Sequence, residues 1–210
     1  MSAAEIADAE RSELADLLLE LGPDQPTLCE GWTTRDLVAH LVVRETRPDA
    51  APGIVLPPLA GYTDLVQGRV ARRDFADLVG AIRSGPPFWS PLALPPLRTI
   101  DVQEYFVHHE DVRRAQAQWA PRPPDEERDA VLWRQCGSMG RIAYRRSPVG
   151  VVQRRPDGAE HVVKQGAHQV VIIGEPGELL LHAVGRDACR VALDGEPEDV
   201  AAISHLDRGV

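Results

Sequence analysis

Two segments with helical spacing carry ionisable side chains among apolar residues, and this feature constrains the fold more than any other. His40 lies in the largely apolar run of residues 31–41, and Glu104 and His108 flank an aromatic and aliphatic stretch. An ionisable group is costly to bury unless it finds a partner. The chain must therefore fold so that these three side chains reach partners.

Helical geometry indicates which of these side chains can meet. Glu104 and His108 are four residues apart, so they project from the same face of a helix, one turn from each other. A third ligand from another helix would complete a metal site, and His40 is the candidate. Such a His–Glu–His set leaves a coordination position open, as catalytic zinc sites do. Alternatively, His40 is a hydrogen-bonded core histidine, and Glu104 and His108 form an intrahelical pair.

Side chains near this trio leave further alternatives. His109 projects about 100° away from His108 around the helix, which argues against ligation by both. Asp111 shares the face of His108 and could steady a ligand, anchor an arginine or carry a solvated charge. Cys29 could supply a fourth, thiolate ligand, although a buried and inert thiol is the default for an isolated cysteine.

The spacing of apolar residues predicts a mainly α protein with two domains. Helical patterns run to about residue 146, interrupted by the proline-rich stretches 48–58 and 91–96. From residue 147 the pattern changes to short strands and helices. The sequence therefore predicts an antiparallel four-helix bundle over residues 1–146, followed by a small α+β domain over residues 147–210.

Charge and composition exclude several classes of partner. The 210 residues carry a formal net charge of −9, which argues against a nucleic-acid or anionic-membrane surface. The first residues lack the basic start and apolar run of a signal peptide, and no apolar stretch is long enough to span a membrane. The three cysteines are widely spaced, so neither a disulfide framework nor a cysteine zinc motif is implied. We expect a cytoplasmic protein of open oligomeric state.

Three segments resemble one protein family. They are Gly-Trp-Thr-Thr-Arg-Asp-Leu-Val-Ala-His-Leu at 31–41, Glu-Tyr-Phe-Val-His-His-Glu-Asp-Val at 104–112, and the late stretch 174–186, which ends in Gly-Arg. Together they resemble the mycothiol-dependent maleylpyruvate isomerase-like group, whose N-terminal half is a DinB-like four-helix bundle. The resemblance implies a divalent metal, usually zinc, bound by His40, Glu104 and His108.

The resemblance also implies a chemistry. An open metal position can lower the pKa of a bound thiol and hold it as a nucleophile. The resemblance implies that this thiol is mycothiol, which would act as co-substrate. Addition to a small electrophilic substrate followed by elimination gives isomerisation, whereas retention of the thiol gives S-transfer. Arg186 would steady a substrate carboxylate, unless it is a structural arginine at a helix end. The alternatives are a non-catalytic metal- or thiol-binding protein and, less favoured, a metal-dependent hydrolase.

Overall fold

The structure, a computed structural model, describes residues 2–54, 56–94 and 98–208. Parts of the two proline-rich stretches, at residues 55 and 95–97, lie outside the described residues. The chain divides into two compact units, Met1–Ala120 and Pro121–Val210. The first unit is helical and the second combines helices with one sheet, which confirms a mainly α chain with a small C-terminal sheet.

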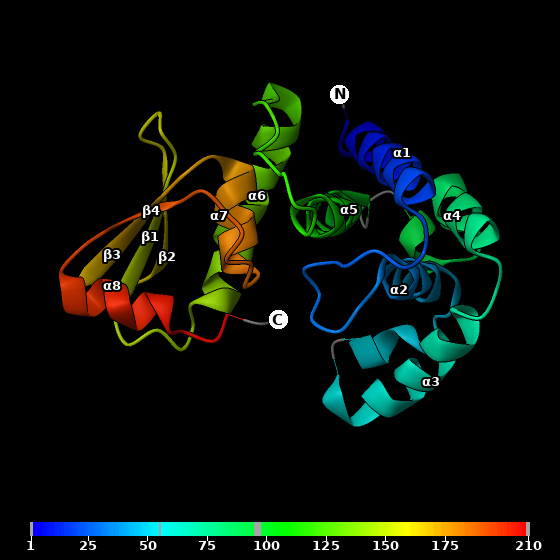
Figure 1. The fold of residues 1–210 in the computed structure, drawn as a ribbon. Coiled ribbons are helices and arrows are strands. Elements are labelled where there is room, and N and C mark those ends of the chain that lie inside the picture. The colour runs from blue at the N-terminus through cyan, green and yellow to red at the C-terminus, as the bar shows by residue number, and fades with distance from the viewer. Residues whose placement is uncertain (1, 55, 95–97, 209–210) are drawn as a thin grey trace. The chain divides into compact units, whose positions relative to one another are not determined.

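Among the residues that the structure describes, the first unit contains five α-helices and three short 3-10 helices (Figure 1). The α-helices are α1 (Ala3–Leu21), α2 (Thr34–Thr46), α3 (Ala60–Val70), α4 (Phe75–Ser84) and α5 (Arg98–Arg114). The 3-10 helices are η1 (Ala51–Ile54), η2 (Pro57–Leu59) and η3 (Pro91–Ala93). Ser2 and Glu5 form a capping box that starts α1, because each side chain satisfies a backbone N–H of the other. Gly22 ends α1 at a φ of 81°, a conformation that favours glycine.

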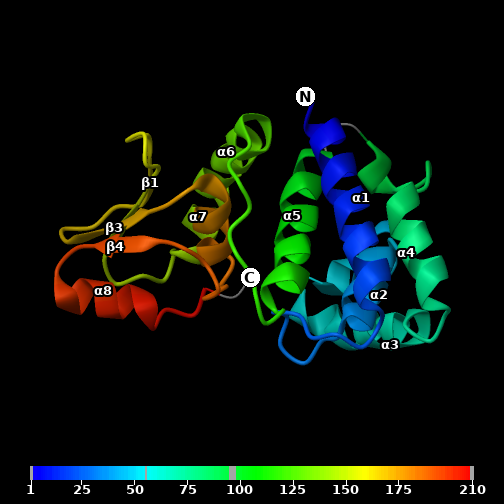
Figure 2. The ribbon, with the colours of Figure 1, turned by 45° about the horizontal axis from the view of Figure 1, so that its top comes forward.

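The core of the first unit draws on four helices. α1 lies alongside α5 (Figure 2), and α4 packs on both α1 and α2. The side chains that meet there are fully buried and come in pairs from α1, α2, α4 and α5: Leu14, Leu18, Leu37, Leu41, Leu78, Ile82, Tyr105 and Val112. Full burial of a leucine or isoleucine stabilises the fold by roughly 1.5–3 kcal/mol. This shared core fixes the faces of α2 and α5 that carry the polar residues described below.

The second unit is a four-stranded sheet with three helices. Its elements are α6 (Glu126–Ala143), β1 (Gly150–Arg154), β2 (Glu160–Lys164), β3 (Gln169–Ile173), α7 (Pro176–Ala183), β4 (Ala192–Asp194) and α8 (Pro197–Ser204). The strand order is β2-β1-β3-β4, with β1 and β3 parallel and both outer pairs antiparallel. α6 packs on α7, β1 and β2, and α8 packs on β3. These elements follow the strands and helices that the sequence predicts from residue 147 onward.

The last long helix, α6, lies in the second compact unit, and the predicted domain boundary at residue 146 stays a prediction. Its apolar pattern predicted a place in a bundle that ends at residue 146. Its buried stripe includes Leu132 and Cys136, as the spacing indicates, but a stripe specifies which face is buried and not what covers it. In the first unit α4 contributes to the core instead. A DinB-like antiparallel four-helix bundle stays a prediction.

Among the helices that the structure describes, none is both long and apolar enough to cross a membrane.

Candidate metal centre

His40 reaches the centre from the middle of α2. The Asp36 carboxylate accepts the backbone N–H of Thr33 at 3.0 Å and so caps the start of that helix. Leu37 and Leu41 on either side of the histidine are fully buried in the core, and His40 is itself only 6% exposed. The indole of Trp32 packs on its imidazole, with ring centroids 5.0 Å apart. Local packing therefore fixes the direction of this side chain.

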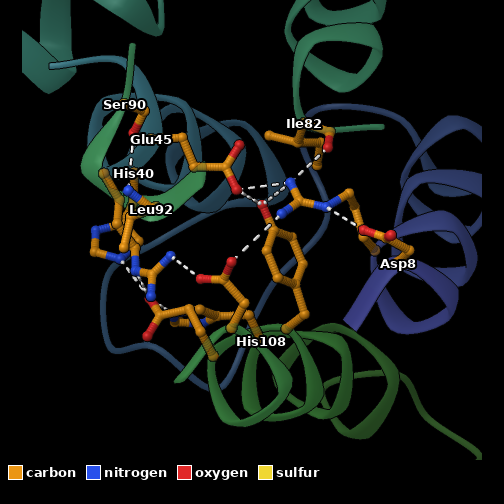
Figure 3. Close-up of polar contacts among 12 residues, drawn as sticks. Asp8, His40, Glu45, Ile82, Ser90, Leu92 and His108 are labelled. Atoms are coloured by element: carbon orange, nitrogen blue, oxygen red, sulfur yellow. Dashed lines mark hydrogen bonds and ion pairs between the residues drawn. The ribbon is translucent and has the colours of Figure 1, made fainter. Parts of the chain in front are cut away.

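α5 brings the other two predicted residues to His40. Glu104 Oε1 lies 3.4 Å from His40 Nε2 and 3.4 Å from His108 Nε2. Figure 3 shows His40 and His108 converging from the two helices, and their ring centroids are 5.3 Å apart. The structure thus places one carboxylate oxygen between two imidazole nitrogens, and the four-residue spacing predicts the half of this arrangement that joins Glu104 to His108.

The separations are informative about what this centre can hold. A strong N–H···O hydrogen bond is usually about 2.9 Å long, so contacts of 3.4 Å are long for direct bonds. Two nitrogen or oxygen ligands at about 2.0–2.1 Å from a tetrahedral ion lie about 3.3–3.4 Å from each other. The three ligand atoms of His40, Glu104 and His108 all lie within 4.8 Å of one another. The donor set and spacing therefore fit a divalent ion with one position left open.

Asp111 orients the imidazole of His108. Its Oδ2 lies 3.0 Å from His108 Nδ1, and the carboxylate is fully buried. Because the carboxylate accepts the Nδ1 proton, Nε2 is left to face Glu104 and His40. The sequence left several roles open for Asp111. In the structure its carboxylate contacts and orients a histidine. Cys29 lies on the same side, with its thiol 3.2 Å from Asp111 Oδ2.

Burial and charge act in opposite directions on the pKa values of the centre. Burial raises the pKa of Glu104, but hydrogen bonds from His108 and His40 and the charge of Arg44 bring it well below 4.5. Burial also disfavours a charged His108, yet Asp111 and Glu104 hold its pKa well above 6.5. Burial lowers the pKa of His40, and Glu104 offsets only part of this. A metal ion at the centre would displace the proton of His108.

Arg44 supports Glu104 from α2. It lies one turn beyond His40, with its Nε 3.4 Å from Glu104 Oε1. Its Nη1 donates to Asp101 Oδ1 at 2.8 Å, and Asp101 is fully buried one turn before Glu104 on α5. The four-residue spacing of Arg44 from His40 puts it on the same face of α2, but no sequence pattern identifies its partners.

A buried arginine on α1 continues this set of charges. Arg11 is 1% exposed. Its Nη1 lies 2.6 Å from Glu45 Oε1, 2.6 Å from the Tyr105 hydroxyl and 2.8 Å from the Ile82 carbonyl. Its Nη2 lies 3.9 Å from Asp101 Oδ2. Side chains of alternating charge therefore follow one another from Arg11 through Asp101 and Arg44 to Glu104 of the candidate centre. Sequence reasoning missed Arg11, although an arginine in the apolar stripe of α1 was the available signal.

Other residues singled out in the sequence lie elsewhere. His109 turns to α1, where its Nδ1 is 3.2 Å from Glu10 Oε2, so it faces away from the centre as its helical position indicates. Arg186 belongs to the second unit, where its Nη1 donates to the Val184 carbonyl at 2.8 Å just after α7. Its predicted contact with a substrate carboxylate stays a prediction.

Comparisons with known proteins agree with this architecture. The structure resembles two crystal structures of mycothiol-dependent maleylpyruvate isomerase, one of them a histidine-to-alanine mutant. The mutant is 15% identical with a TM-score of 0.63 over 92% of both chains. The other is 17% identical with a TM-score of 0.56 over 92% of this chain and 91% of that one. At such identities the likeness shows a shared fold. No curated protein matched the sequence.

A family match extends the likeness to the sequence. Residues 7–113, just over half of the chain, match the family described as mycothiol maleylpyruvate isomerase N-terminal domain. The matched region includes His40, Glu104 and His108 together with Arg44 and Asp111. The chain therefore belongs to the mycothiol maleylpyruvate isomerase N-terminal domain family.

Proposed function

We propose that this protein binds a divalent metal ion, zinc in the cell, through His40, Glu104 and His108. The convergence of these three side chains carries the proposal, since their mutual distances fit co-ligands better than hydrogen-bond partners. Two imidazoles and one carboxylate are a common ligand set for catalytic zinc. The family of the chain supports this role, and a DinB-like four-helix bundle would be its scaffold.

We further propose that the protein is a mycothiol-dependent isomerase or thiol S-transferase. A metal in the centre would lower the pKa of a thiol at its open position. The thiolate would add to an electrophilic carbon of a small substrate, forming a C–S bond while the electron pair moves onto the conjugated carbonyl. Loss of the thiolate after bond rotation gives the isomer, and protonation with the thiol retained gives the conjugate. Arg186 would steady a substrate carboxylate.

The residues around the centre support this chemistry by holding the ligands. Arg44 and Asp101 fix Glu104 on one side, and Asp111 fixes the tautomer of His108. A ligand whose direction is set before the ion arrives loses less freedom on binding it.

Elemental analysis followed by calorimetry with mycothiol tests the proposal. Purified wild-type protein should contain about one zinc ion per chain, and the His108→Ala variant should contain none because it loses a ligand. His109→Gln is the matched control, since it changes the neighbouring histidine, which faces Glu10. Circular dichroism of each variant checks that it folds. A His108→Ala protein that retains stoichiometric metal would show that the ligands lie elsewhere.

Calorimetry separates an enzyme from a binding protein. The metal-loaded protein should bind mycothiol, and the metal-stripped protein should not. Metal-loaded protein that neither binds mycothiol nor consumes it with any of a panel of electrophiles would exclude the enzyme. A non-catalytic metal-binding protein would then be the remaining function.

A further inference from the structure

His108 has potential ligands on both sides of its ring. Its Nε2 faces Glu104 and His40, whereas its Nδ1 lies 3.0 Å from Asp111 Oδ2 and 3.9 Å from the sulfur of Cys29. The sulfur is 3.2 Å from the same carboxylate oxygen. Cys29, His108 and Asp111 thus form a second cluster of a thiol, an imidazole and a carboxylate.

We propose that this second cluster binds a thiophilic divalent cation such as Cd²⁺ or Zn²⁺. For a tetrahedral ion with ligands at about 2.0–2.3 Å, the edges between ligand atoms are about 3.3–3.6 Å. The three separations in the cluster depart from these edges by only about 0.4 Å, so small rotations of the side chains close the site. A thiolate among the ligands selects soft metals over magnesium or calcium. Cys29 is partly exposed, so an ion can reach it.

The loop that carries Cys29 is fixed to α5 by the backbone. The N–H of Leu28 donates to the carbonyl of Asp111 at 3.0 Å, which ties the loop to the helix at the residue that contributes the carboxylate. The Thr27 hydroxyl accepts the N–H of Cys29 at 3.2 Å, and the Cys29 carbonyl accepts the N–H of Trp32 at 3.0 Å. The thiol is therefore held beside its two co-ligands without an ion.

The two sites share one imidazole and therefore exclude each other. A neutral histidine has a single lone pair available for a metal, on whichever nitrogen does not carry the proton. When Nε2 binds an ion with His40 and Glu104, Nδ1 keeps its proton and donates to Asp111. When Nδ1 binds an ion with Cys29, the proton moves to Nε2, where Glu104 accepts it. A thiophilic ion would therefore switch off the first centre without displacing His40 or Glu104.

Cadmium binding to the metal-stripped protein, followed by the ultraviolet charge-transfer absorption of a cadmium–thiolate bond, tests this proposal. The absorption should appear in the wild-type protein and in His40→Ala, which keeps the whole second cluster. It should disappear in Cys29→Ser, where the cation has no thiolate. Cys136→Ser and Cys189→Ser are matched controls that should retain it, because neither residue is in the cluster.

The outcomes distinguish this site from the first centre. No absorption in wild type, or absorption that persists in Cys29→Ser, would overturn the second site. Loss of absorption in His40→Ala would also overturn it, because Cys29 would then be a ligand of the first centre. Calorimetry of the His109→Gln protein, which lacks the separate Glu10, Glu13 and His109 group, should find one Cd²⁺ per chain, and two per chain would disprove mutual exclusion. The test does not depend on the proposed activity, since metal content and thiol binding of the first centre are measured separately.

Discussion

Replacing Arg11 with methionine should destabilise the helical unit by about 3–5 kcal/mol at neutral pH, the usual cost of removing one partner of a buried ion pair. The contacts of its Nη1 to Glu45, Tyr105 and Ile82 give a similar figure. The two hydrogens of that nitrogen sustain two strong bonds, and each bond to a charged group contributes roughly 1.5–3 kcal/mol. Methionine fills most of the space but leaves Glu45, which is 2% exposed, without its cation.

Equilibrium unfolding in urea, followed by circular dichroism and tryptophan fluorescence, measures this effect. With a slope of about 2 kcal/mol per molar urea, the midpoint should fall by about 2 M. Glu45→Gln and the double variant complete a mutant cycle. The double variant should lose about 2 kcal/mol less than the sum of the single variants, because a neutral amide can accept the Tyr105 hydroxyl without needing Arg11.

The loss should depend on pH in a defined direction. Burial already raises the pKa of Glu45, and Arg11 opposes this. Without Arg11 the folded pKa rises further above the unfolded value of about 4.3. A raised carboxyl pKa means that the folded state binds more protons, so the deficit is largest at neutral pH and shrinks toward pH 4.3. A loss below about 1 kcal/mol, no coupling to Glu45→Gln, or a deficit that does not change with pH would refute this reasoning.

Two further predictions concern the second unit. Burial lowers the pKa of His182 to about 3 in the folded state, whereas its pKa in the unfolded state is about 6.5. Between these two pH values the unfolded state binds one more proton, so the free energy of unfolding falls as the pH drops. Wild type should lose about 2 kcal/mol between pH 7 and pH 5 from this group. His182→Gln should remove that part of the pH dependence in urea unfolding, and an unchanged profile would contradict the assignment. Arg186→Ala should reduce turnover with mycothiol while metal content stays constant, and Arg186→Lys should restore only part of it. Equal turnover in all three proteins would leave Arg186 with a structural role.

The convergence of the candidate metal ligands could be predicted in part from the sequence because it follows local periodicity. Residues four apart on a helix share a face whatever the rest of the chain does, so the pairing of Glu104 with His108 needed no tertiary information. His40 could be nominated because a histidine among buried apolar residues must find a partner. The start of α2 was equally local, since Thr33 and Asp36 form a cap within one turn.

The support of this centre could not be predicted in the same way. The contacts of Arg11 join α1 to residues that are 34 to 94 positions away in the chain, and no periodic pattern encodes such pairings. Cys29 shows the same limit, because its place on the Nδ1 side of His108 depends on a loop anchored through a backbone bond to Asp111. From the sequence alone, Cys29 could be either a metal ligand or an inert thiol.

The sequence by itself determined the helices, the short strands after residue 147 and the residues that could bind a metal. Tertiary structure decided which helices share a core: α6 lies in the second unit, and α4 contributes to the core of the first. It also decided which nitrogen of His108 faces Asp111 and which faces Glu104. The physical reason is the same in both cases. Hydrophobic periodicity specifies which face of an element is buried, whereas its partner and the orientation of its polar groups depend on residues distant in the chain.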